Sequence, residues 1–215
     1  MLRRDFLMAT SIVAASTMAG GGATGMGAPV RKLSVFNSIS LDGHFTDGTS
    51  DMSWAHAPDP EWQQFTAENA GGDAELIFGR KTYEMMASFW PTPQAKQMMP
   101  EVAASMNRMS KNVFSRSLKD VSWENSRLAR GDLVAEVRRL KSEPGPGLLI
   151  MGSGEIVSQL TQAGLIDDFQ LVTVPIVLGK GRSLFEGVTS RPGFELTKTR
   201  IFKSGKIVAW YEASP

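Results

Sequence analysis

Residues 148–157 read Leu-Leu-Ile-Met-Gly-Ser-Gly-Glu-Ile-Val, an apolar run that leads through two glycines into a second apolar stretch. A continuous apolar run of this length is typical of a strand that is covered on both faces of a sheet. After Gly154 the apolar residues recur at helical spacing, and Gly164 stands where a helix commonly ends in a left-handed residue. A strand, a glycine turn and a helix in this order predict one unit of an α/β domain.

The glycine turn itself, Gly152-Ser153-Gly154, predicts a binding site for an anion. The first N–H groups of a helix and the positive end of its dipole attract negative charge, and glycine lets a pyrophosphate approach the backbone. The third glycine of a Rossmann fingerprint is replaced here by Val157. The pattern is therefore also compatible with a tight turn that needs glycine only for its backbone angles.

Two other predicted strand ends carry cations and hydroxyl groups. Gly79 leads into Arg80-Lys81-Thr82 at the start of a helix, where the helix dipole disfavours cations unless an anion binds. Ser115-Arg116-Ser117 surrounds a guanidinium with hydroxyls, which suits a terminal phosphomonoester such as the 2′-phosphate of NADP. Each set also fits solvated side chains on an exposed loop, but three such ends in one domain favour a phosphate-rich ligand.

The rest of the chain alternates between strand and helix patterns. We expect strands at residues 33–37, 74–79, 111–115, 148–151 and 169–177, helices at 60–70, 80–88, 100–107, 133–143 and 154–163, and a C-terminal hairpin of 194–202 and 206–211. Pro175 indicates an edge strand or a bulge at that point. The alternation predicts an α/β fold, a single domain with a mixed, mainly parallel sheet that is flanked by helices. Ligands of such sheets bind beyond the carboxyl ends of the strands.

The composition excludes several classes of function. The chain has 215 residues and a formal net charge of +1, so no basic excess favours nucleic acid as a partner. It has no cysteine, which excludes disulfides, thiolate zinc sites and a cysteine nucleophile. We interpret its two histidines, His44 and His56, as ordinary loop residues and expect no bound metal.

Residues 1–29 have the order of a bacterial signal sequence. Arg3-Arg4 precedes an apolar stretch and a glycine-rich segment that ends at Ala28-Pro29. The paired arginine resembles a twin-arginine motif, which predicts export to the periplasm. The apolar stretch of about 14 residues is shorter than the roughly 20 that span a bilayer, so we expect no stable membrane anchor. If the segment is only a tail, the protein is cytoplasmic; in either case we expect residues 30–215 to form the domain.

Five segments of the domain resemble the dihydrofolate reductase superfamily, and within it the group that contains the reductase domain of the bifunctional riboflavin-biosynthesis deaminase-reductase. The resemblance covers essentially all of residues 30–211. It implies a dihydrofolate reductase-like fold, an NADPH cofactor and a homodimer. The segments are Ser38–Gly43, Gly79–Glu84, Lys111–Arg116, Gly152–Gly154 and Pro175–Phe185.

The resemblance also implies roles for individual residues, taken position by position from its motifs. Three groups would bind the cofactor: one at its phosphates, one at its adenosine end and one around its pyrophosphate. In that order they are Gly79, Arg80, Lys81 and Thr82; Ser115 and Arg116; and Gly152, Ser153, Gly154, Glu155, Ile156 and Val157. A fourth group would lie by the nicotinamide and the substrate entrance, namely Ser40, Leu41, Asp42 and Gly43.

The catalytic side of the site carries fewer signals. Asp42 is the best-placed carboxylate and would donate a proton if an apolar surrounding raised its pKa, although Asp-Gly is also a common turn pair. Trp54 and Arg182 are candidate substrate contacts, with the protein core and a tight connection as the alternatives. Glu61 and Glu68 either face the pocket or lie on a solvated helix surface.

The sequence therefore predicts an NADPH-dependent oxidoreductase that reduces a small pyrimidine- or pterin-like heterocycle, or a related carbonyl or imine, as 5-amino-6-(5-phosphoribosylamino)uracil reductase does. One alternative is a non-catalytic protein of the same fold that binds a nucleotide, flavin or pterin. Another is a true dihydrofolate reductase. In each case the expected partner is a small molecule.

Overall fold

The computed structural model describes residues 30–56, 59–69 and 72–214. Ten strands are found in these residues. They are β1 (Leu33–Ile39), β2 (His44–Asp47), β3 (Ala74–Gly79), β4 (Lys111–Phe114), β5 (Ser126–Ala129), β6 (Gly147–Met151), β7 (Asp168–Thr173), β8 (Gly181–Ser183), β9 (Phe194–Ile201) and β10 (Ile207–Ala213).

The helices begin where the sequence supplies caps and prolines. Asp132 accepts a hydrogen bond from the Ala135 N–H (2.8 Å) at the start of α5, and Thr92 caps α3 in the same way. The helices are η1 (Ser53–His56), α1 (Pro60–Asn69), α2 (Arg80–Ala87), α3 (Pro93–Met98), α4 (Pro100–Arg108), α5 (Leu133–Ser142) and α6 (Gly154–Gln162).

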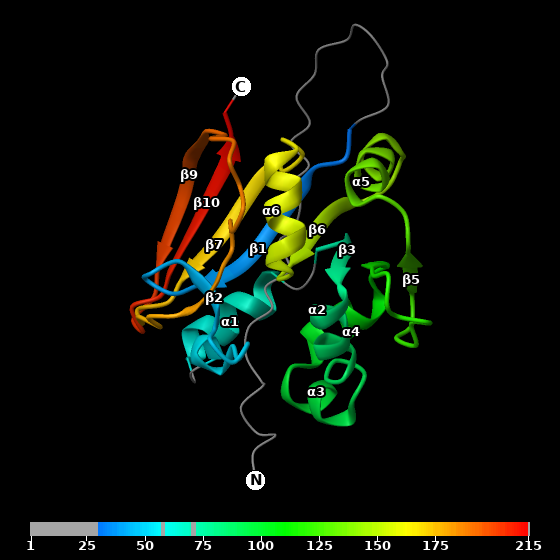
Figure 1. Ribbon diagram of the computed structural model, residues 1–215. Helices are drawn as coiled ribbons and strands as arrows, with labels where there is room; N and C mark the ends of the chain where they lie inside the picture. Colours follow the sequence, from blue (N-terminus) through cyan, green and yellow to red (C-terminus); the bar gives the residue numbers. More distant parts are fainter. Residues whose placement is uncertain (1–29, 57–58, 70–71, 215) are drawn as a thin grey trace, which may run out of the picture.

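Eight strands form one sheet in the order β5-β4-β3-β6-β1-β7-β10-β9, and β2 pairs with β8 separately. Strands β1 and β3 to β7 run parallel, whereas β10 is antiparallel to both of its neighbours. Figure 1 shows α6 in front of the sheet and the β9–β10 hairpin at one edge. The mixed, mainly parallel sheet and the C-terminal hairpin predicted from the sequence are confirmed.

Each face of the sheet buries its own apolar cluster. The first cluster joins the sheet to α1, α2 and α4 through residues such as Trp62, Tyr83 and Val102. The second joins it to α5 and α6 through residues such as Val137 and Val157. Because both faces are covered at β6, this strand is apolar from Leu148 to Met151, which explains the continuous apolar run that precedes Gly152.

The segment around Pro175 differs from its prediction. The strand expected over residues 169–177 ends at Thr173, and β7 is an internal strand between β1 and β10. Beyond the strand, the Leu41 N–H donates to the Ile176 carbonyl (2.8 Å), so this segment binds the turn after β1. The prediction of an edge or bulge at Pro175 was wrong because the proline lies after the ladder, where no strand N–H is required.

In the residues that the structure describes, no helix has the length and apolar character needed to cross a membrane. The predicted leader, residues 1–29, lies outside the described residues.

Candidate functional site

A cavity of about 900 Å³, which we call the cleft, opens where parallel strands of the sheet end. The carboxyl ends of β1, β3, β4, β5 and β6 all reach it, as expected for ligand sites in α/β sheets. The sequence-predicted strand ends therefore meet in one place. The lining at these ends includes Gly79–Thr82, Phe114–Ser117, Ala129–Leu133 and Met151–Ile156.

The turn from β6 into α6 is held by the side chain of Ser153. Gly152 and Ser153 have positive φ angles of 69° and 63°, which makes the turn tight enough to lead straight into the helix. Ser153 Oγ donates to Thr82 Oγ1 (2.8 Å) and accepts from the Gly79 N–H (2.7 Å). The hydroxyl thus joins the ends of β6 and β3 and orients the first turn of α6, where Gly154 lines the cleft.

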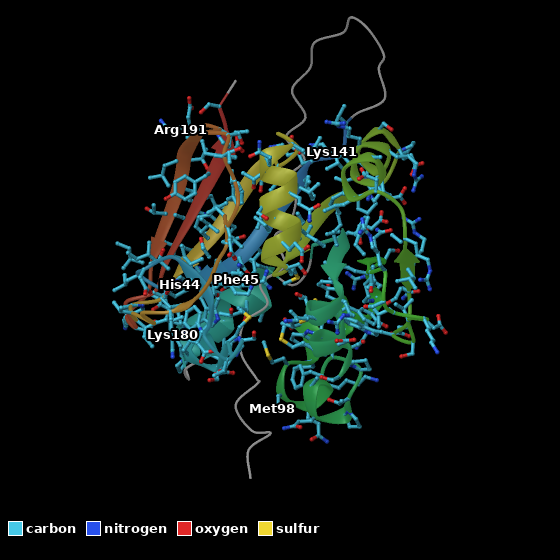
Figure 2. All side chains as sticks on the ribbon, in the orientation of Figure 1. His44, Phe45, Met98, Lys141, Lys180 and Arg191 are labelled. Atoms are coloured by element: carbon cyan, nitrogen blue, oxygen red, sulfur yellow. The ribbon has the colours of Figure 1, made fainter. Side chains whose placement is uncertain are left out.

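The small β2–β8 sheet covers the start of α6. A Cβ atom at position 154 would overlap the ring of Phe45, so only glycine fits there. Phe45 lies beside α6 in Figure 2, and the guanidinium carbon of Arg182 lies 5.7 Å from the centroid of its ring. Arg182 lines the cleft as well. A cation therefore stands near a helix N-terminus whose N–H groups favour an anion.

The start of α2 adds two further cations to the cleft. Arg80 and Lys81 line it directly after β3, and the capping residue Gly79 provides no side-chain hydrogen bond to the first turn. Arg80 Nη1 lies 2.9 Å from Glu84 Oε2 on the exposed side of the helix. The N–H groups of this first turn and the ammonium of Lys81 suit a bound anion.

The loops after β4 and β5 form the far end of the cleft. Ser115 Oγ accepts from the N–H groups of Ser117 and Leu118 (3.2 and 3.0 Å), which fixes the loop. Arg116 is exposed and lines the cleft, and it makes no ion pair or hydrogen bond within the part of the chain that the structure describes. Arg130 lines the same end and donates to the Lys119 carbonyl (3.0 Å).

Another part of the lining is largely apolar, with the polar residues Asn37, Ser38 and Ser50 next to it in the chain. Trp90 donates its indole N–H to the sulfur of Met86 (3.1 Å), and its ring packs edge-on against Phe89, with the centroids 5.0 Å apart. We call this part of the lining the apolar wall. It consists of Phe36, Met52, Met85, Met86, Phe89 and Trp90.

His56 lines the cleft together with the apolar wall. Burial lowers the pKa of His56 from 6.5 to about 4; the charge of Asp51 acts in the opposite direction, and the charge of Lys206 adds to the lowering. The imidazole is therefore neutral at pH 7. His56, which the sequence predicts to be an ordinary loop histidine, ends η1 and lines the cleft.

Asp42 has a different environment from the one that a proton donor needs. Its carboxylate accepts hydrogen bonds from Ser40 Oγ (2.6 Å) and from the N–H groups of Leu178 (3.1 Å) and Gly179 (2.8 Å). The bond from Ser40, together with these two N–H groups, holds the pKa of Asp42 well below its usual range. We therefore correct the expectation of a proton donor: Asp42 ties the turn after β1 to the segment after β7.

Other residues predicted to lie near the nicotinamide and substrate also lie outside the cleft lining. Ser40 is buried in the turn after β1, Leu41 is exposed on it, and Gly43 completes it with a positive φ of 78°. Trp54 packs against the first core cluster and donates to the Asp51 carbonyl (3.2 Å). Of this group, the structure places Arg182 alone in the lining.

Three further positions show structural roles. Val157, predicted beside the pyrophosphate, is fully buried in the second cluster. Glu61 accepts from the Lys203 N–H (3.0 Å), and Glu68 lies 3.8 Å from Arg200, so both belong to the surface of α1. In the described part of the chain no cluster of acidic or histidine side chains could hold a metal ion.

The sequence matches the protein family described as the RibD C-terminal domain over residues 31–208. Among solved structures, it is similar to a protein of Shewanella sp. PV-4 with a proposed place in riboflavin biosynthesis. The two are 24% identical with a TM-score of 0.68, and the match covers 86% of this chain and 99% of the other.

Two more solved structures share the fold at lower identity. The diaminohydroxyphosphoribosylaminopyrimidine deaminase/5-amino-6-(5-phosphoribosylamino)uracil reductase of Thermotoga maritima is 16% identical with a TM-score of 0.62, over 86% of this chain and 57% of that one. The dihydrofolate reductase of Enterococcus faecalis, complexed with NADP(H) and RAB-propyl, is 15% identical with a TM-score of 0.57, over 86% and 97%. These similarities confirm the dihydrofolate reductase-like fold.

Proposed function

This chain belongs to the family of the RibD C-terminal domain, and from that premise we propose that it is an oxidoreductase that uses NADPH to reduce a small ring compound or a related carbonyl or imine. The observation that carries the proposal is the cleft: three strand ends with anion-binding features meet in one cavity that also has an apolar wall. Its volume of about 900 Å³ suits a nucleotide cofactor together with a small second ligand.

The residues of the cleft fit a dinucleotide that carries a terminal phosphate. Gly154 lets the ring of Phe45 pack directly against the first turn of α6, because a Cβ atom there would overlap that ring. The two glycines and the first turn of α6 would hold the pyrophosphate. At the far end, Arg116 has no protein partner among the described residues, and with Ser117 it would bind the 2′-phosphate.

Bound NADPH would supply the hydride. The apolar wall would hold the reacting rings together and exclude water from them. His56 keeps a neutral imidazole at this wall, which can donate or accept a hydrogen bond at a ring heteroatom. The carboxylate of Asp42 stays ionised in its turn and takes no part in proton transfer.

Calorimetric titration of the full chain with NADPH and, in parallel, NADH tests the cofactor assignment. We expect micromolar binding of NADPH and a Kd for NADH at least about tenfold higher. NADPH consumption with a panel of heterocycles, aldehydes and imines, dihydrofolate included, then tests the reaction. Absence of binding for both nucleotides would refute the proposal. A ligand retained through purification, with no consumption of bound NADPH, would support the non-catalytic binding protein instead.

A further inference from the structure

The charged side chains of the cleft are unevenly distributed. Its cations stand at strand ends or over the start of α6, where the cofactor phosphates would lie. These cations are Arg80, Lys81, Arg116, Arg130 and Arg182. The lining carboxylates, Asp132 and Glu155, likewise lie at the starts of α5 and α6.

The apolar wall, by contrast, is built from thioethers and aromatic rings. Phe36, Phe89 and Trp90 are buried members of the first core cluster, and Met86 packs against them. The indole N–H of Trp90 is engaged by the sulfur of Met86. Unbranched thioethers adapt to flat ring surfaces and make favourable contacts with their edges.

An anionic group on this wall would lose its hydration without gaining a charged partner. His56 is the titratable side chain of the lining at the wall, and it is neutral at pH 7 because burial lowers its pKa to about 4. Lys206, whose charge also acts on His56, is buried, lies outside the lining and is paired with Asp59 (3.4 Å). Lys81, one helical turn before Met85, is exposed at the mouth of the cleft beside the end of β3. Transfer of an unpaired ionised group into such an apolar surrounding is strongly unfavourable.

We propose that the substrate half of the cleft binds an uncharged, phosphate-free flat ring compound, a quinonoid or heteroaromatic molecule with a heteroatom that faces His56. This inference rests on the proposed function, because it assigns the cations of the cleft to the cofactor. It excludes a substrate whose phosphate must be anchored at the apolar wall.

Matched ligand pairs test the inference by binding, without any need for turnover. Saturating NADP⁺ is present, so that the cations assigned to the cofactor are occupied. Quenching of tryptophan fluorescence then measures the binding of each ligand. The pairs are 1,4-naphthoquinone with its 2-sulfonate, and riboflavin with FMN. The chain has no cysteine with which a quinone could react. We expect the uncharged member of each pair to bind at least about tenfold more tightly.

A variant that adds a cation to the apolar wall tests the same inference in a second way. Met85→Arg changes a half-buried wall residue, and we expect it to reduce the preference for the uncharged member at least about threefold. Met98→Arg is the matched control, because Met98 is exposed on α3 and lies outside the lining (Figure 2).

The outcomes separate the two proposals. If NADP⁺ and NADPH do not bind, the proposed function fails. If they bind and the anionic members bind as tightly as the uncharged ones, or if no ring compound binds, the cofactor assignment stands and the inference about the substrate is overturned.

Discussion

Arg116 is an exposed guanidinium that follows β4, with a hydroxyl residue on either side and no ion pair in the described residues. Arg116→Ala should remove charge-assisted contacts to a 2′-phosphate that are worth about 1.5–3 kcal/mol. We expect NADPH to bind roughly tenfold to a hundredfold more weakly and NADH to be unaffected, as measured by calorimetry. Arg191→Ala, an exposed arginine outside the cleft lining, is the control (Figure 2). An equal loss for both nucleotides would contradict the assignment.

His56 makes the stability of the fold depend on pH. Burial lowers its pKa to about 4 in the folded protein, whereas the unfolded chain takes up this proton near pH 6.5. Between these values the unfolded state binds more protons, so the free energy of unfolding should fall as pH falls, by up to about 3 kcal/mol. Urea unfolding between pH 7 and about 4 measures this slope. We expect His56→Gln to flatten this slope, with His44→Gln, which removes the other histidine, as the matched comparison. A slope that is unchanged in His56→Gln would show that other groups cause the pH dependence.

The residues of the cleft differ in how well the sequence revealed them. Arg80, Arg116 and Gly154 were predictable, because a side chain that follows a parallel strand is carried to the same edge of the sheet as its counterparts. The position of Asp42 outside the cleft was not, because besides the bond from Ser40 its carboxylate binds N–H groups of residues 136 and 137 positions away. The place of Met85 in the lining of the cleft was hidden as well, since methionine is common in ordinary cores.

Lys111 joins the end of α4 to the loop between β4 and β5. Its side chain is buried, and its ammonium donates to the carbonyls of Asn107 (3.1 Å), Met109 (2.7 Å) and Glu124 (3.1 Å). Lys111→Met should leave the carbonyls of Met109 and Glu124 unpaired at a cost of about 1–3 kcal/mol, whereas the Asn107 carbonyl keeps its bond from Asn125 Nδ2 (3.0 Å). Thermal unfolding would then show a Tm lower by several degrees. The exposed residue Lys119 provides a control, and a Tm for Lys111→Met equal to that of Lys119→Met would disprove the role of the three hydrogen bonds.

Long elements were predictable from periodicity, but short ones were not. Strand β5 carries no clear alternation over Ser126–Ala129, and its place is fixed by parallel pairing with β4. Strand β8 is shorter still, and its pairing with β2 needs glycine at position 181, because a side chain there would overlap the Thr46 carbonyl. Such pairings are tertiary, and the β2–β8 sheet that covers α6 was therefore missed in the sequence.

At the scale of the whole molecule, the sequence predicted the alternation of the longer strands and helices and the α/β fold with a mixed, mainly parallel sheet, because these follow from apolar patterns along the chain. For the location of the protein in the cell, the sequence offers a single signal, the paired arginine in residues 1–29. If residues 1–29 act as a twin-arginine signal, Arg3→Lys with Arg4→Lys should keep the protein in the cytoplasm, whereas the unchanged chain reaches the periplasm. Fractionation of cells that express both forms measures this, and equal distribution would argue against export.

We propose that a second copy of the chain binds at the outer strand of the sheet. Strand β9 is an edge of the eight-stranded sheet, and it exposes Leu196 (56%) and Ile201 (71%) to solvent. Exposed apolar side chains on an unpaired edge favour association, and two copies related by a two-fold axis would cover the same strand in each other. We therefore expect the full chain to sediment as a dimer.

Leu196→Lys combined with Ile201→Lys should convert this dimer to a monomer, because two cations would face their counterparts across the axis. The substitutions lie at exposed positions of β9, so the cooperative thermal transition should persist. Analytical ultracentrifugation of the wild type, the double variant and Met98→Lys, an exposed change on α3, separates the possibilities. A dimer that survives the double variant would place the interface elsewhere. A monomeric wild type would contradict the prediction of a dimer.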